Sequence, residues 1–378
     1  MTEPEEQARQ QIDEQLRQAG WVIQDVDHIN LGEAPGIAVR EYPTDSGPAD
    51  YFLFVDKKAI GVIEAKPAGD TLSGVVDQTE RYAENLPNPL PSFDLPLRFR
   101  YESTGVRTYF TDYADPQPRQ REVFHFHWYQ TLRKWSKQSR TLRGRLKQLP
   151  EINRGTLRDC QYEAIQGLER SLAEGRPRSL IQMATGSGKT YMAVTESYRL
   201  LKHAKAERVL FLVDRSNLGK QAMTEFAQYT PPDDNRNFNE LYNVRHMKSN
   251  KIDDTDRLVI STIQRIFSLL KGDALDEDLE RESGFETESD AGDPVEVEYN
   301  EQLRPEHFDF IIIDECHRSI YNKWRQVLEY FDAFLIGLTA TPAKKTFGFF
   351  NQNLVTEYPH ERAVADGVNV DYDVYRIN

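Results

Sequence analysis

Two charged residues, Glu64 and Lys66, interrupt an otherwise apolar run in the stretch IEAKPAG at residues 63–69. The sequence leading into them, ADYFLFVDKKAIGVIEAK, has two apolar segments separated by a polar turn at residues 56–58, which predicts an antiparallel hairpin. Successive side chains of a strand point to opposite faces, so we expect Glu64 and Lys66 on one face of the second strand. Asp50 begins the partner strand and is expected to lie beside them.

This set of side chains is suited to cutting a phosphodiester. Asp50 and Glu64 would hold Mg²⁺. Lys66 would position or help to deprotonate the attacking water, and it would offset the charge that develops on the phosphate. The alternative interpretation is structural, because Glu64 and Lys66 on an edge strand would form an ordinary salt bridge. The residues of the hairpin leave both interpretations open.

A glycine-rich segment, ATGSGKT, follows an apolar run and precedes helix-like sequence, which is the context that a phosphate-binding loop requires. The glycines would allow backbone amides to approach the phosphates of ATP, the lysine would supply charge to the β- and γ-phosphates, and the threonine would ligate Mg²⁺. The strict pattern has glycine where Met183 stands, so a coincidental glycine-rich turn is the alternative. The residues of this loop that we expect to bind the cofactor are Gly186, Ser187, Gly188, Lys189 and Thr190.

A second acidic pair, Asp314 and Glu315, ends the apolar run in FIIIDECH. Asp314 would hold the nucleotide's Mg²⁺ through water, and Glu315 would polarise the water that attacks the γ-phosphate. The alternative is a buried strand that merely ends in two acidic residues. Together with the glycine-rich segment, the pair predicts ATP and Mg²⁺ as cofactors.

Five short apolar runs alternate with helix-like sequence after residue 152. This spacing predicts a doubly wound, parallel α/β sheet. The runs are SLIQMA, RVLFLVD, RLVIST, FDFIIIDE and FLIGLTA.

The first part of the chain mixes helix and strand patterns. Residues 5–21 predict an amphipathic helix, because Ile12 and Leu16 lie four residues apart and Gly20 is a stop signal. The alternation in VFHFHWY, residues 123–129, predicts a strand. Its two histidines lack a third metal ligand and are interpreted as structural or solvent-facing. We therefore expect an α+β domain at residues 1–132, a basic connector at 133–152 and an ATPase-like domain at 153–378.

The net charge of -14 is unevenly distributed. Residues 271–300 hold twelve acidic and two basic residues, which predicts a disordered, solvated insertion. Residues 133–147 hold seven basic and no acidic residues, so they are either a phosphate-contacting stretch or a solvated linker.

Cysteine content and hydropathy exclude two further classes of protein. Cys160 and Cys316 are the two cysteines of the sequence, too few for a disulfide framework, and we expect reduced thiols. The sequence has no run of 18 apolar residues, and the N-terminal ten residues are acidic rather than signal-like. These features predict a soluble, cytoplasmic protein with no membrane partner.

The motifs after residue 152 resemble those of superfamily 2 helicases and translocases, in that family's order. They are ATGSGKT, VDRSNLGKQ, STIQR, DECH and LTATP. The resemblance implies that Gln161 recognises adenine, and that His317 and the segment 339–341 couple the nucleotide state to DNA contact. It also implies a second RecA-like lobe that supplies arginines to the nucleotide cleft. We therefore expect this chain to be part of a longer protein and to be a poor ATPase alone.

The hairpin pattern of Asp, thirteen residues, then Glu-x-Lys resembles PD-(D/E)xK nucleases. Gln78 and Tyr82, one helical turn apart, match the QxxxY motif that accompanies this nuclease in the motor subunit of type I restriction enzymes. The same resemblance implies that Glu6, on the opening helix, completes the metal site. Taken alone, Gln78 and Tyr82 would be a solvated helix face and a core aromatic.

Nuclease, basic connector and superfamily 2 motor lobe follow one another as in HsdR-type subunits. The resemblance implies a restriction subunit that joins methyltransferase and specificity subunits, translocates double-stranded DNA with ATP, and cuts unmethylated DNA in phage defence. The sequence contains no motif for reading bases, which fits sequence recognition by a partner. Two alternatives stay open: a stand-alone nuclease-helicase of DNA repair or phage defence, and a motor or assembly module with a vestigial nuclease.

Overall fold

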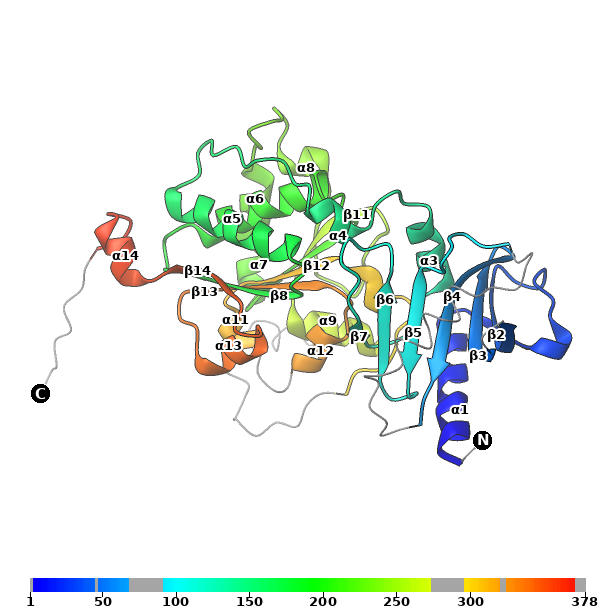
Figure 1. Cartoon of the computed structure of the whole chain (residues 1–378). Coiled ribbons are helices and arrows are strands. Elements are labelled where there is room, and N and C mark those ends of the chain that lie inside the picture. Colours follow the sequence, from blue (N-terminus) through cyan, green and yellow to red (C-terminus); the bar gives the residue numbers. More distant parts are fainter. Residues whose placement is uncertain (1–2, 45–46, 68–90, 273–295, 320–323, 371–378) are drawn as a thin grey trace, which may run out of the picture. The chain divides into compact units, whose positions relative to one another are not determined.

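The computed structural model describes residues 3–44, 47–67, 91–272, 296–319 and 324–370 (Figure 1). The chain divides into two compact units, Met1–Gly144 with Arg304–Glu306, and Arg145–Leu303 with His307–Asn378. The first boundary lies within helix α4 (Leu142–Leu146), in the basic stretch, and the second lies within the short helix η2 (Pro305–His307). Most of the acidic segment 271–300 lies outside the described residues. Within the described residues, no helix is both long enough and apolar enough to span a membrane.

The first unit is built on a seven-stranded mixed sheet of order β1-β2-β3-β4-β5-β6-β7. The pairs β1/β2 and β4/β5 are parallel, and the other neighbours are antiparallel. The elements are α1 (Glu3–Gln18), β1 (Val22–Asp25), η1 (Val26–His28), β2 (Gly36–Thr44), β3 (Gly47–Val55), β4 (Lys58–Ala65), β5 (Phe99–Ser103), β6 (Thr108–Asp112), β7 (Arg121–Val123) and α3 (Tyr129–Ser136).

The hairpin predicted from the sequence is confirmed as β3 and β4. Its turn consists of Asp56 and Lys57, both with positive φ (47° and 66°), a conformation that matches the twist of the two strands. In the neighbouring parallel pair, Gly61 of β4 lies opposite Phe99 of β5. A Cβ atom at position 61 would come within 2.5 Å of the Phe99 carbonyl oxygen. The close approach of β4 and β5 therefore requires glycine at this position.

Helix α1, predicted at residues 5–21, packs its apolar stripe on the sheet. Ile12 and Leu16 are fully buried in a cluster with Tyr51 and Ile63 of the hairpin. Burial of each such aliphatic side chain is worth about 1.5–3 kcal/mol. The stripe therefore fixes which side of the helix faces the strands.

The strand predicted in VFHFHWY is wrong beyond its first residue. Strand β7 ends at Val123, and the next residues are irregular until α3 begins. His125, Phe126 and His127 are buried in succession, so the apolar and polar positions do not segregate to two faces. The chain bends here to bury both histidines, and their structural interpretation is supported by this burial.

The second unit is a seven-stranded, wholly parallel sheet of order β10-β11-β9-β12-β13-β8-β14, which confirms the predicted fold class. The five predicted apolar runs form β8, β9, β11, β12 and β13. Its strands are β8 (Arg178–Met183), β9 (Val209–Val213), β10 (Asn243–His246), β11 (Asp256–Thr262), β12 (Phe310–Ile313), β13 (Phe334–Thr339) and β14 (Leu354–Tyr358).

Helices cover both faces of this sheet (Figure 1). Helices α5 and α6 lie on one side, while α9 and α12 bury their apolar residues against the strands on the other. The helices are α5 (Asp159–Ala173), α6 (Lys189–Lys202), α7 (Ser216–Gln228), α8 (Phe238–Leu241), α9 (Ile263–Lys271), α11 (Cys316–Ser319), α12 (Arg325–Glu329), α13 (Lys344–Phe349) and α14 (His360–Ala365).

Helix α6 buries an unusual group, the carboxyl of Glu196. The residue is fully buried, and neither carboxyl oxygen has a hydrogen-bond partner among the described residues. Burial raises the pKa of Glu196 well above 4.5, the charge of Glu169 adds to this effect, and Arg199 opposes it. A buried carboxyl without a partner is held in its neutral form.

This burial predicts a pH-dependent stability. Above pH 4.5 the unfolded chain releases the Glu196 proton while the folded chain keeps it, so the free energy of unfolding falls as pH rises toward the raised pKa. The loss is about 1.4 kcal/mol per pH unit in that window. We expect Glu196→Gln to lack this loss in urea unfolding between pH 5 and pH 8. The exposed Glu174→Gln is the control, and parallel pH profiles of all three proteins would contradict the assignment.

Candidate functional sites

The hairpin brings the two predicted metal-binding carboxylates together. Tyr51 of β3 pairs with Ile63 of β4, and the same antiparallel register places Asp50 opposite Glu64 at the next position. Glu64 is 5% exposed, and the Asp50 side chain is 16% exposed. The structure therefore places two acidic groups side by side at a largely buried point of the sheet.

The Glu64 carboxyl has one satisfied and one unsatisfied oxygen. Its Oε1 accepts a hydrogen bond from Lys66 Nζ at 2.9 Å, whereas its buried Oε2 has no hydrogen-bond partner among the residues that the structure describes. Burial raises the pKa of Glu64, the charge of Asp50 raises it further, and Lys66 opposes both effects. A divalent cation would satisfy the unpaired oxygen and offset the charge, so the residues present fit a Mg²⁺ or Mn²⁺ ion. Lys66 lies beside Glu64, as both the catalytic and the salt-bridge interpretations of the sequence predict.

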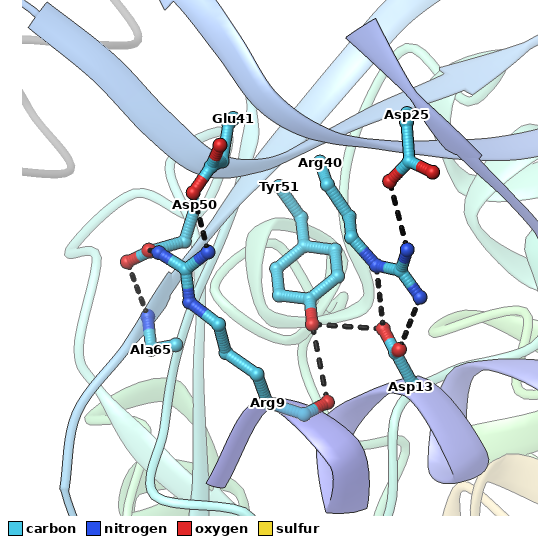
Figure 2. Close-up of polar contacts among 8 residues, drawn as sticks. All are labelled: Arg9, Asp13, Asp25, Arg40, Glu41, Asp50, Tyr51 and Ala65. Atoms are coloured by element: carbon cyan, nitrogen blue, oxygen red, sulfur yellow. Dashed lines mark hydrogen bonds and ion pairs between the residues drawn. The ribbon is translucent and has the colours of Figure 1, made fainter. Parts of the chain in front are cut away.

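The Asp50 carboxylate has a partner that the sequence does not predict. Its Oδ2 accepts the Ala65 backbone N–H at 2.9 Å, and its Oδ1 accepts from Arg9 Nη2 in an ion pair. Arg9 also donates from Nη1 to Glu41 Oε1 at 2.8 Å (Figure 2). The sequence could have indicated this contact, because Arg9 follows Ala8 and so lies at the edge of the apolar face with which α1 packs on the sheet.

The remaining predicted residues of this site are not tested by the structure. Glu6 is exposed on α1, and no contact joins it to Asp50 or Glu64 in the described part of the chain. Gln78 and Tyr82 lie outside the described residues. Among the residues that are described, no group of three or more His, Cys, Asp or Glu side chains is gathered for a metal ion. A metal here would therefore need main-chain or water oxygens beside the two carboxylates.

The glycine-rich loop joins β8 to α6 in the second unit. Gly186 and Gly188 both have positive φ, 79° and 84°, and Gly188 is the N-cap residue directly before α6. Lys189, in the first turn, lies with Nζ 3.4 Å from the Met183 carbonyl oxygen and 3.2 Å from Glu315 Oε1. The helix N-terminus and the lysine thus both present positive charge at the loop.

The side chain of Gln161, on α5, forms hydrogen bonds with the backbone of this loop. Its buried side-chain amide donates to the carbonyl oxygens of Ser187 (3.2 Å) and Gly188 (3.1 Å), and its Oε1 accepts the Arg158 N–H at 2.9 Å. A Cβ atom on Gly188 would come within 2.3 Å of Gln161 Nε2. Gln161 therefore supports the loop, and its role in adenine recognition stays a prediction.

The predicted acidic pair follows β12 and faces the loop lysine. Burial raises the pKa of Asp314 to about 6, with a further contribution from the charge of Glu315. Glu315 has a positive φ of 45°, uncommon for a residue with a side chain, and its N–H donates to Asp314 Oδ1 at 3.1 Å. Such a backbone conformation is typical of functional sites, where the surrounding structure holds it.

A row of polar contacts leads from the acidic pair to the next strand end. His317 Nδ1 lies 3.5 Å from Glu315 Oε2 and 2.8 Å from Thr339 Oγ1. Thr339 Oγ1 also accepts the Thr341 N–H at 3.1 Å. The residues predicted to couple nucleotide state to DNA contact are therefore in direct contact with each other and with Glu315.

Two arginines of the basic stretch 133–147 form ion pairs with acidic residues of the first unit. Arg133 pairs with Asp56 at 2.6 Å, and Arg143 lies 3.7 Å from Asp115. These contacts support a structural role for part of the stretch, and phosphate contact stays a prediction.

Two family models match the chain. The model described as type III restriction enzyme, res subunit, matches residues 154–344, just over half of the 378 residues. The model described as type I restriction enzyme EcoKI endonuclease subunit second domain matches residues 32–98. The matched ranges contain the glycine-rich loop and the hairpin, respectively.

Two curated relatives and one solved structure are also similar to this chain. The chain is 28% identical over 440 residues to the type I restriction enzyme EcoKI endonuclease subunit of Escherichia coli K12, covering 98% of this chain and 35% of the relative. It is 29% identical over 226 residues to the EcoAI endonuclease subunit of E. coli, covering 58% of this chain and 24% of the relative. A fragment structure assigned to an HsdR subunit from Vibrio vulnificus YJ016 is 24% identical, with a TM-score of 0.39, over 95% of this chain and 60% of that one.

The chain thus spans about a third of the length of the EcoKI subunit. It belongs to the restriction-enzyme family of the res-subunit model, and along nearly its whole length it is similar to an endonuclease subunit of a type I restriction enzyme.

Proposed function

We propose that this chain is the nuclease domain and first motor lobe of the restriction subunit of a type I restriction-modification complex. The subunit would translocate double-stranded DNA with ATP and cut unmethylated DNA with Mg²⁺, in the cytoplasm, together with methyltransferase and specificity subunits. The observation that carries the proposal is the largely buried Asp50–Glu64 pair beside Lys66, in which Glu64 Oε2 has no hydrogen-bond partner within the described part of the chain. The other unit of the same chain holds the glycine-rich loop that we propose to bind phosphate.

In the nuclease unit, Asp50 and Glu64 would hold the divalent cation. When bound, the cation would polarise the phosphodiester and lower the pKa of a coordinated water. Lys66 holds Glu64 Oε1, which leaves Oε2 for the cation, and its ammonium offsets the negative charge of the two carboxylates. Because the pKa of Glu64 is raised, cation binding must displace a proton more often as pH falls, and the affinity decreases accordingly.

In the motor unit, Lys189 and the amides of the glycine-rich loop would bind the phosphates of ATP. Lys189 now pairs with Glu315, so a bound γ-phosphate would compete for the lysine and release the carboxylate to orient water. Thr190 in the first turn of α6 and Asp314 would hold the Mg²⁺ of the nucleotide. Glu315 contacts His317, and His317 in turn contacts Thr339, so this exchange would have a route toward the segment 339–341 that is predicted to respond to DNA.

Nucleotide binding by the loop is tested at Gly188. In Gly188→Ala the new Cβ would collide with the Gln161 amide at a φ of +84°, so loop and glutamine must separate. We expect ATP affinity to fall at least tenfold, since one misplaced charge-assisted hydrogen bond costs about 1.5–3 kcal/mol. Fluorescent-nucleotide titration of the full chain measures this. Gly348→Ala, whose Cβ meets open space, is the matched control. Unchanged affinity in Gly188→Ala would contradict nucleotide binding at this loop.

The division of labour between the two units is tested at Glu64. In the full-length protein with its methyltransferase and specificity subunits, we expect Glu64→Ala to reduce cleavage of unmethylated plasmid about a thousandfold or more, because a cation ligand is lost. DNA-stimulated ATP hydrolysis should be retained. The exposed Glu122→Ala is the control.

Three outcomes of this experiment would count against the proposal. Loss of ATP hydrolysis in Glu64→Ala would remove the separation of the two activities. ATP-dependent cutting without the partner subunits would favour a stand-alone nuclease-helicase. If the wild-type complex hydrolyses ATP in the presence of DNA but does not cut the DNA, a motor with an inactive nuclease fold would be favoured.

A further inference from the structure

We propose that Arg9 competes with the divalent cation for Asp50, and that Glu41 is the partner to which the arginine is released. The side chain of Arg9 on helix α1 would then control whether the nuclease site can be loaded with metal. The inference rests on the proposed function, because it assumes that Asp50 and Glu64 hold the cation.

The competition follows from which oxygen of Asp50 is accessible. Oδ2 accepts the Ala65 backbone N–H, and Oδ1 accepts from the Arg9 guanidinium (Figure 2). A cation held by Asp50 and Glu64 would need an Asp50 oxygen, and the positively charged guanidinium already pairs with Oδ1. Two cations on one carboxylate oxygen repel each other by direct Coulomb interaction in a partly buried environment. Metal binding is therefore favoured when Arg9 leaves Asp50.

Glu41 gives the displaced arginine a place to go. The pairs Arg40–Tyr51 and Tyr42–Ala49 flank Glu41 and Asp50, which makes these two residues cross-strand neighbours. Arg9 bridges them, with Nη1 bonded to Glu41 Oε1 at 2.8 Å. Moving the guanidinium fully to Glu41 keeps one charge-assisted bond and exposes Asp50 Oδ1. The Glu41 side chain is 54% exposed, so this position is also the better hydrated one.

The helix itself does not need to move. Asp13, one turn after Arg9, pairs with Arg40 and accepts the Tyr51 hydroxyl at 2.8 Å (Figure 2). The same turn buries Ile12 in the sheet core. These contacts anchor α1 independently of Asp50. The exchange is therefore a side-chain movement of Arg9 on a fixed helix.

The test is a calorimetric titration of the full chain with Mn²⁺. We expect Arg9→Gln to bind Mn²⁺ about tenfold more tightly than the wild type, because a competing charged hydrogen bond is removed. Glu41→Gln should bind more weakly than the wild type, by about threefold, because Arg9 then has only Asp50 as a partner. Arg17→Gln, on the same helix with a side chain 53% exposed, removes the same charge away from the site and should not change the affinity.

The two variants shift the affinity in opposite directions, which a general loss of stability would not do. Equal or weaker binding in Arg9→Gln, with wild-type thermal unfolding, would overturn the inference. If Arg9→Gln fails to fold, Arg9→Met replaces it, since methionine keeps a long unbranched chain for packing on the helix. The same tenfold gain is expected from it, and its absence would overturn the inference equally.

Asp50→Asn separates this inference from the proposed function. The Mn²⁺ binding that disappears in Asp50→Asn belongs to the nuclease site. If none disappears, the proposed metal site is wrong and the inference falls with it. If binding disappears in Asp50→Asn but Arg9→Gln and wild type agree, the nuclease site stands and only the competition by Arg9 is wrong.

Discussion

Two carboxylates that lie side by side inside a protein require nearby positive charge, and the first unit is arranged around that requirement at Asp50 and Glu64. Lys66 supplies one cation from the end of the same strand, and Arg9 supplies another from α1. The raised pKa of Glu64 shows that these charges do not fully compensate its burial. A further cation held at this point, as we propose, would offset the remaining cost of burying the two carboxylates.

The second unit also contains two adjacent acidic residues, and a lysine from a neighbouring element pairs with one of them. Asp314 and Glu315 are consecutive in the chain, and burial of Asp314 together with the charge of Glu315 raises the pKa of Asp314 to about 6. Lys189 reaches Glu315 from the adjacent loop at the ends of the parallel strands, where ligand sites of such sheets are usually found. In both units a lysine pairs with the glutamate of an acidic pair. The difference is that Lys189 is also the proposed phosphate ligand and must change partner.

The sequence predicts those parts of the structure whose signals are local. The hairpin follows from two apolar runs and a polar turn, the parallel sheet follows from five short apolar runs, and the tight turn between β8 and α6 follows from its glycines. The strand expected in VFHFHWY fails because consecutive burial of His125 and Phe126 depends on tertiary packing, which an alternating pattern does not reveal. Edge strands β10 and β14 are missed because their sequences are not continuous apolar runs.

The partner of Asp50 is missed for a related reason. The resemblance implies a glutamate, Glu6, at the metal site, whereas the structure brings Arg9 of the same helix to Asp50. Which side chain of an amphipathic helix meets a given strand depends on the rotation of the helix about its axis, and here the burial of Ile12 and Leu16 sets that rotation. Glu6 and Arg9 are three residues apart, so they lie on nearly the same face of α1 about one turn apart along its axis.

The contact of Gly61 with the Phe99 backbone bears on how this sheet tolerates variation. No residue of strand β5 takes part in the proposed chemistry. Gly61, three residues before Glu64, nevertheless sets the distance between β5 and β4. Any side chain at position 61 would have to push the two backbones apart and would shift the end of β4 with them. In a randomised library selected for an intact sheet, position 61 would accept a narrower set of residues than the acidic positions, although it performs no chemistry itself.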